Sequence, residues 1–85
     1  MSDLLHLKNI GKNIEKKLIS IGIDSKQKLF EIGSRQAFVD LKQKYPNICL
    51  VHLYALEGAI LNIELDKLPE KIKDDLKNFS DFLKK

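Results

Sequence analysis

This 85-residue sequence has little cysteine, little arginine and no long apolar run. Its one cysteine, Cys49, excludes an internal disulfide and fits a reducing compartment, so we expect a cytoplasmic protein. No apolar stretch approaches the roughly 20 residues that a membrane-spanning helix needs, and the first residues show no signal peptide. Arg35 stands alone among 14 lysines. Because arginine is the usual reader of guanine edges, sequence-specific recognition of DNA is not expected.

The composition is that of a globular domain, with 44% hydrophobic and 32% charged residues. A chain this short buries only about 60% of its unfolded surface, which leaves little room for a catalytic pocket beside the core. We therefore expect one domain over residues 1–85, with no enzymatic activity, cofactor, metal, membrane contact or small-molecule substrate. The net charge of +3 permits contact with nucleic acid but does not by itself indicate it.

The apolar spacing predicts an all-α fold, because no window alternates as a strand does. Gly22 and Gly33 each follow an isoleucine at the end of an apolar run, which is typical of a helix stop. Helices are expected at 3–8, 13–21 and 26–32, from Ser34 to Tyr45, at 48–61 and from Pro69 onward. Their expected N-caps are Ser2, Asp24 or Ser25, Ser34 and Asn47.

The stretch from 48 to 61 is apolar on nearly all sides, which indicates a buried central helix. Leu56 is expected in the core, and Gly58 with its alanine neighbours would let a neighbouring helix approach closely. The last helix carries a single apolar stripe at Leu68, Ile72, Leu76, Phe79 and Leu83. The predicted fold class is a compact all-α bundle of five or six short helices around the central helix.

The N-terminal part of this bundle resembles a helix-hairpin-helix motif, with Asn9-Ile10-Gly11 as its turn. Asparagine tolerates a positive φ, so Asn9 can stand in for a glycine, and Ile10 would lie between the two helices. Backbone N–H groups would then face outward at a helix N-terminus, where anions bind. The candidate site for a DNA phosphate comprises Asn9, Ile10, Gly11, Lys12, Asn13, Lys16 and Lys17.

The same two-helix hairpin also occurs in domains that bind only protein or no partner, so two functions stay open. One is weak, non-specific binding of the DNA backbone, and the other is a protein-interaction module without DNA contact. The arrangement of the lysines discriminates between the two hypotheses. DNA binding is favoured if Lys12, Lys16 and Lys17 share one exposed face that is free of acidic residues. Glu15 lies among these lysines in the sequence.

Glu57 stands in the most apolar part of the chain, where an ionised carboxylate needs partners. We expect it to accept hydrogen bonds from backbone N–H groups at a helix start and so to stabilise the packing. Cys49 and His52 are three residues apart but supply only two of the four ligands of a structural zinc site. Cys49 is therefore predicted to be a buried thiol, and His52 a histidine with a satisfied hydrogen bond.

The order of these features resembles the C-terminal domain of the TfoX/Sxy family over about residues 4–77. The resemblance rests on Leu7-x-Asn9-Ile10-Gly11, on Leu53-Tyr54-Ala55-Leu56-Glu57-Gly58-Ala59, and on Leu68-Pro69. It implies a compact helical domain without enzymatic activity or cofactor, and a role in regulating natural competence, that is, DNA transformation. Family members often carry an N-terminal domain ahead of this one. The alternative partner is therefore a transcription regulator, or a protein that carries such an N-terminal domain.

Overall fold

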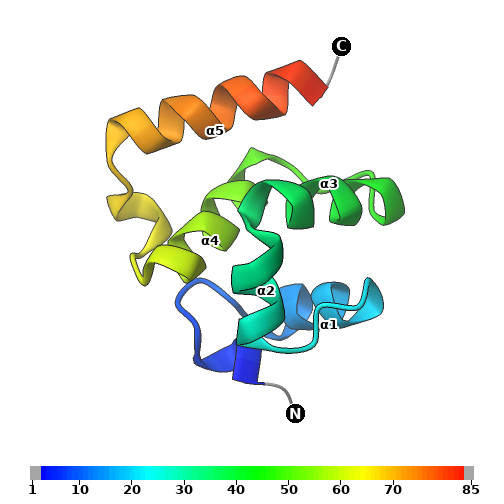
Figure 1. Ribbon diagram of the computed structural model, residues 1–85. Helices are drawn as coiled ribbons and strands as arrows, with labels where there is room; N and C mark the ends of the chain where they lie inside the picture. Colours follow the sequence, from blue (N-terminus) through cyan, green and yellow to red (C-terminus); the bar gives the residue numbers. More distant parts are fainter. Residues whose placement is uncertain (1–2, 84–85) are drawn as a thin grey trace.

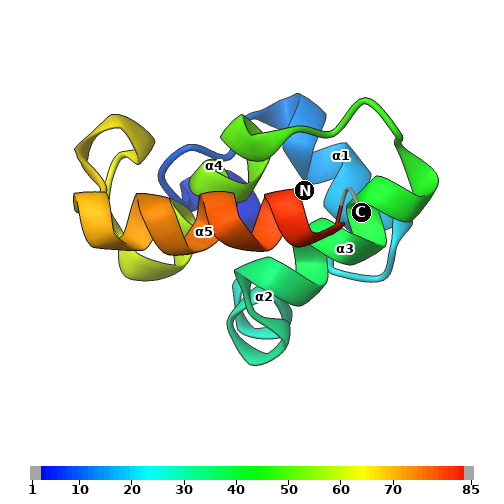
Figure 2. The same cartoon turned by 90° about the horizontal axis from the view of Figure 1, so that it is seen from above.

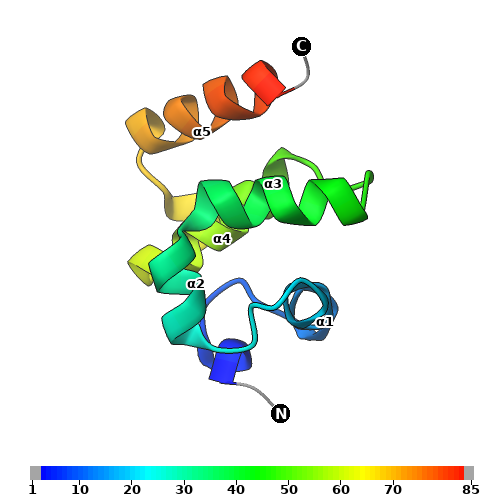
Figure 3. The same cartoon turned by 45° about the vertical axis from the view of Figure 1, so that its right-hand side comes forward.

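The computed structural model describes residues 3–83, and that range contains helices and no strand. Figures 1 and 3 show three tiers, with α5 in one, α3 and α4 in the middle one, and α1, α2 and η1 in the third. This confirms the expected compact all-α fold. The elements in chain order are η1 (Asp3–His6), α1 (Lys12–Ser20), α2 (Lys26–Ile32), α3 (Ser34–Lys44), α4 (Leu50–Leu61), η2 (Leu65–Lys67) and α5 (Glu70–Leu83).

The middle of the fold is α4, which contacts α3, η2 and α5. Its side chains Leu53 and Leu56 are fully buried, as the apolar run predicts. The most exposed residues of the helix lie at its two ends, where Val51 and Leu61 are 55% and 41% exposed. In the view of Figure 2, α5 passes over α4, which fits a surface helix that packs through one apolar stripe.

The first three α-helices are short because the chain turns sharply between them. Of the two expected caps, Asp24 and Ser25, it is Ser25 that caps α2, accepting a hydrogen bond from the backbone N–H of Lys28 at 3.2 Å. Gly33 both ends α2 and precedes α3, with φ 86° and ψ 160°. Residues with a Cβ rarely adopt this backbone conformation, so Gly33 allows two helices to meet without a linker.

Several predicted helix ends need correction. The expected helix 3–8 is only the four-residue 3-10 turn η1, and its predicted cap Ser2 lies outside the described residues. Ser34 is the first residue of α3 and not its cap. Cys49, and not Asn47, is the N-cap of α4. Pro69 lies just before α5 instead of at its first position, and η2 was not predicted. Such errors of one or two residues are common at helix ends, because a cap and a first turn use similar residue types.

Helix α2 buries only one of its three apolar side chains. Leu29 is fully buried, but Phe30 and Ile32 are 48% and 39% exposed. The reason is geometric, since a helix of seven residues makes only about two turns and presents one narrow face to its neighbour α3. The stripe predicted for the last helix does pack on the core, with Leu68 and Leu76 buried and the other three members partly so.

Candidate functional site

The candidate hairpin is a tight turn that connects η1 with α1. Asn9 has a φ of 70°, in the left-handed region that the sequence predicts for a residue in place of glycine. Ile10 is 6% exposed and belongs to the hydrophobic core, so its side chain anchors the turn. Asn9 and Ile10 thus have the φ and the burial expected of them, but η1 is only a 3-10 turn, so the helix-hairpin-helix motif stays a prediction.

The side chain of Asn9 also makes two hydrogen bonds that the sequence analysis missed. Its Nδ2 donates to the carbonyl oxygen of Ile63 at 2.9 Å, and its Oδ1 accepts from the N–H of Leu65 at 3.0 Å. These bonds connect the hairpin to the loop after α4. We call this pair of bonds the Asn9 clamp. No sequence pattern indicates a partner 54 residues away, so only the structure could reveal it.

Gly58 is the point at which α4 contacts the Asn9 clamp. An ideal Cβ at Gly58 would lie closer than 3.0 Å to both the carbonyl oxygen of Ile63 and the Nδ2 of Asn9. The close approach that the sequence predicts at Gly58 therefore exists, but it involves a loop and the hairpin turn instead of a helix. The carbonyl of Gly58 also accepts the N–H of Ile63 at 2.8 Å, just after Asn62 ends α4 in the left-handed conformation.

The N-terminus of α1 has no side-chain cap. Gly11 is the N-cap residue, with φ −95° and ψ 179°, and no side chain accepts a hydrogen bond from the first turn. The first backbone hydrogen bond of the helix is donated by Glu15 to the carbonyl of Gly11 at 2.9 Å. The N–H groups of Lys12 and Asn13 therefore have no partner within the helix.

Position 11 does not require a glycine, either for its backbone φ or for the space around it. Its φ of −95° suits any residue, and an ideal Cβ there would meet no atom within 4 Å. The space at the missing Cβ of Gly11, next to the uncapped N–H groups, is therefore open. A ligand oxygen could therefore approach the backbone at this point without displacing a protein atom.

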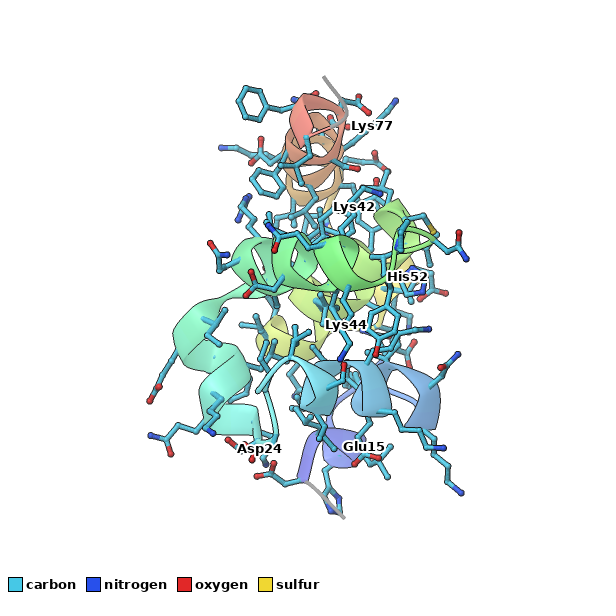
Figure 4. The ribbon with its side chains drawn as sticks, turned by 90° about the vertical axis from the view of Figure 1, so that its right-hand side faces the viewer. Glu15, Asp24, Lys42, Lys44, His52 and Lys77 are labelled. Carbon is cyan, nitrogen blue, oxygen red and sulfur yellow. The ribbon has the colours of Figure 1, made fainter. Side chains whose placement is uncertain are left out.

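The charges of α1 are divided between its faces. Lys12 and Lys16 are exposed, whereas Glu15 is only 8% exposed. Figure 4 shows Glu15 on the side of α1 that faces η1. Glu15 therefore does not share the exposed surface of Lys12 and Lys16, which lie one helical turn apart.

Lys17 does not belong to that face. Its Nζ donates to Oδ1 of Asn13 at 3.3 Å and lies 5.5 Å from the centre of the Tyr45 ring. Five residues separate Lys17 from Lys12, which is about 140° around a helix axis. Of the three predicted lysines, the structure thus groups Lys12 with Lys16 and places Lys17 beside α3.

The prediction that Cys49 is buried is wrong, because its thiol is exposed. The buried apolar run begins with Ile48, but α4 itself begins at Leu50, and Cys49 has the extended backbone of an N-cap. In an extended chain neighbouring side chains point to opposite sides, so Cys49 points outward where Ile48 points inward. His52 has the hydrogen bond that was expected, since its Nδ1 accepts the N–H of Cys49 at 3.2 Å. Within residues 3–83, no group of three or more potential ligands could hold a metal ion.

Glu57 has a partner at a helix start, but the donor differs from the predicted one. Its Oε1 accepts the hydroxyl hydrogen of Ser34 at 2.6 Å, and Ser34 is the first residue of α3. Ser34 is 3% exposed, so this hydrogen bond satisfies a buried hydroxyl and joins α3 to α4. Leu56, the neighbour of Glu57, is fully buried, as predicted.

These features define a small all-helical domain with an anchored hairpin and an open helix N-terminus. The chain belongs to the TfoX C-terminal domain family, whose model matches residues 1–80. No protein with a curated description matches the chain. None of the helices in residues 3–83 has both the length and the apolar character needed to span a bilayer.

Two solved structures are similar to this chain over nearly its whole length. The triclinic crystal form of an uncharacterised protein from Listeria monocytogenes is 40% identical, with a TM-score of 0.93. The match covers 95% of this chain and 92% of that one. The tetragonal form of a Listeria monocytogenes protein of unknown function is 39% identical, with a TM-score of 0.90. That match covers 93% of this chain and 98% of the other.

Proposed function

We propose that this domain binds the DNA backbone, weakly and without sequence preference, through the N-terminus of α1. The backbone N–H groups of Lys12 and Asn13 would donate to phosphate oxygens, and Lys12 and Lys16 would supply positive charge. The proposed role is one of binding and not of catalysis. As the family resemblance implies, binding would serve the regulation of natural competence in the cytoplasm.

The observation that carries the proposal is the open helix N-terminus at Gly11. The side chain of Ser25 caps α2, whereas α1 has no side-chain cap and has open space at the position of the missing Cβ of Gly11. Uncapped N–H groups and the helix dipole together favour an anion. Because phosphate contacts of this kind do not read the bases, no sequence preference is expected.

The charge distribution supports the same proposal. Lys12 and Lys16 take part in neither of the ion pairs of the described residues, which are Lys28 with Asp24 and Lys67 with Glu64. The nearest acid in the sequence, Glu15, is buried on another side of α1. The two ammonium groups are therefore available to a polyanion.

The direct test is titration of a labelled duplex at several salt concentrations. A cluster this small reaches about three phosphates, so log affinity should fall with log salt at a slope near −2.7. The dissociation constant should be on the order of 10⁻⁴–10⁻⁶ M and equal for unrelated duplexes. Replacing Lys12 and Lys16 together with glutamate should abolish binding while leaving the helical circular dichroism spectrum unchanged.

A second variant separates binding from stability. Gly11→Ser places a hydroxyl where it can accept the N–H groups of the first turn, and its Cβ has room. We expect equal or slightly higher thermal stability, because serine is a better N-cap than glycine. DNA affinity should fall, because the new side chain occupies the position of the phosphate. Unchanged affinity would mean that the helix N-terminus is not the contact.

The alternative is a protein-interaction module, and exposed apolar side chains favour it. Phe82 on α5 is 70% exposed and Phe30 on α2 is 48% exposed. Exposed aromatic side chains are enriched at protein interfaces. This alternative predicts no DNA binding even at low salt, so a flat titration would replace the DNA proposal with a module that docks on a transcription regulator or on a partner carrying the N-terminal domain.

A further inference from the structure

A pocket of about 230 Å³ lies between α1, the end of α3 and the start of α4. Its wall includes the basic side chains of Lys17, Lys44 and His52, the ring of Tyr45, and the apolar residues Pro46 and Ile48. No acidic residue lines it. In Figure 4, Lys44 points from α3 towards α1, and His52 lies on the same side of the molecule.

The two lysines are held in place on one aromatic ring. The Nζ atoms of Lys17 and Lys44 lie 5.5 and 5.8 Å from the centre of the Tyr45 ring. The Nζ of Lys44 also donates to the carbonyl of Ser20 at 3.3 Å, and the hydroxyl groups of Ser20 and Tyr45 are 2.7 Å apart. Because these contacts order the side chains before any ligand arrives, binding would cost less conformational entropy than at free surface lysines.

Both ammonium groups lack a carboxylate partner. Within residues 3–83 neither Lys17 nor Lys44 forms an ion pair, and their hydrogen-bond partners, Asn13 and the Ser20 carbonyl, are neutral. Two positive charges thus lie close to one aromatic ring without neutralisation. This arrangement attracts an anion and has room for one in the adjoining pocket.

His52 adds a third donor to the wall. Its Nδ1 accepts the backbone N–H of Cys49 at 3.2 Å, so in the neutral ring the hydrogen is carried by Nε2, which can donate. His52 lies in the first turn of α4, the end of the helix that carries partial positive charge. The three basic side chains therefore come from three different helices and surround one pocket.

We propose that this pocket binds a phosphate group through Lys17, Lys44 and His52. A phosphate presents several oxygens to separate donors, which suits cations that approach from different helices. The apolar wall of Pro46 and Ile48, with the Tyr45 ring, would contact the organic part to which the phosphate is attached. The site uses none of Gly11, Lys12 or Lys16, so it goes beyond the contact proposed at the hairpin.

Two sources could supply such a phosphate: a small phosphate monoester or the backbone of DNA. The first probe is inorganic phosphate, added to the ¹⁵N-labelled protein at fixed pH and ionic strength with chloride as the control anion. We expect saturable shifts of the backbone amides from Tyr45 to His52 and of the His52 ring. Phosphate should also raise the melting temperature, as any ligand of the native state does.

The matched variants are Lys17→Gln with Lys44→Gln, and Lys71→Gln with Lys77→Gln. The first pair should weaken phosphate binding by about tenfold or more for each lysine, as expected for charge-assisted hydrogen bonds. The second pair lies on exposed positions of α5, outside both proposed phosphate contacts, so it makes the same charge change and should leave phosphate binding unaltered. Thermal melts of both double variants show whether each is folded. Absence of saturable shifts with both phosphate and duplex, or shifts that persist in the first pair, would overturn the proposal.

A duplex titration then distinguishes the two sources. If the pocket holds DNA phosphates, the Lys17→Gln, Lys44→Gln variant should make the slope of log affinity against log salt shallower by about 1.8. Each of the two lost contacts accounts for about 0.9 of this change. Inorganic phosphate should then compete with the duplex. If the pocket holds a small phosphate monoester, the slope stays the same and the duplex does not displace phosphate from the pocket. Either result supports a phosphate pocket and shows which of the two sources supplies the phosphate.

Discussion

Replacing Gly58 with alanine tests the contact between α4 and the Asn9 clamp. The added methyl group would lie closer than 3.0 Å to the Nδ2 of Asn9 and to the carbonyl oxygen of Ile63. These are the two atoms of one hydrogen bond, 2.9 Å long. The methyl group therefore cannot be accommodated unless the loop moves away from α4 and the bond lengthens or breaks.

The expected cost follows from three contributions. Overpacking of this kind costs about 1–3 kcal/mol, and loss of the hydrogen bond about 0.5–1.5 kcal/mol. Alanine in place of glycine inside a helix returns about 1 kcal/mol through its helix propensity. We therefore expect Gly58→Ala to lower the free energy of unfolding by about 2 kcal/mol. In a domain of this size that corresponds to a fall of about 8–16 °C in melting temperature, measured by circular dichroism.

The control is Asn9→Gly, which keeps the positive φ of the turn but removes both hydrogen bonds of the clamp. In that background Gly58→Ala should cost about 1 kcal/mol less, since one clashing atom is gone and no bond remains to be broken. The difference between the two costs of Gly58→Ala separates the contribution of the Asn9 side chain from the clash with the carbonyl oxygen of Ile63. If Gly58→Ala alone melts at or above the temperature of the unmodified protein, the close approach is not a feature of the fold.

Three other changes probe the core, the helix junction and the exposed thiol. Glu57→Leu should destabilise the protein by about 1–3 kcal/mol, because it leaves the buried hydroxyl of Ser34 without its acceptor, while Glu57→Gln should retain most of the stability. A rise in urea midpoint for Glu57→Leu would contradict this. Leu56→Ala should cost about 2–5 kcal/mol in the same assay, as core leucines do, and a cost below 1 kcal/mol would show that Leu56 is not enclosed. Cys49 should react with a thiol reagent in the native state at a rate similar to that of a free cysteine peptide; a reaction that needs denaturant would show that the thiol is covered.

Local rules predicted those parts of the fold whose causes lie within a few residues. The cap Ser25, the stop at Gly33 and the positive φ of Asn9 each follow from the backbone preference of one residue type. The central position of α4 follows from its composition alone. In each case the information lies in a short window of sequence.

Features that depend on distant residues could not be predicted in this way. The partners of Asn9 are 54 and 56 residues away, and Ser34 meets Glu57 across 23 residues. The exposure of Cys49 depends on where α4 begins, and apolar periodicity does not fix that to within one residue. The pocket at Lys44 is likewise formed by three separate helices, so no single stretch of sequence reveals it.

The Asn9 clamp has a consequence for the order in which the chain folds. The turn at Asn9 is synthesised before its two side-chain partners, Ile63 and Leu65, which lie 54 and 56 residues further along the chain. Before Leu65 has been synthesised, the left-handed conformation of Asn9 lacks the two hydrogen bonds that stabilise it. The hairpin should therefore acquire its final shape late, after α4 has formed and closed a long loop. A peptide of the hairpin alone would carry the sequence of the proposed binding surface without its geometry.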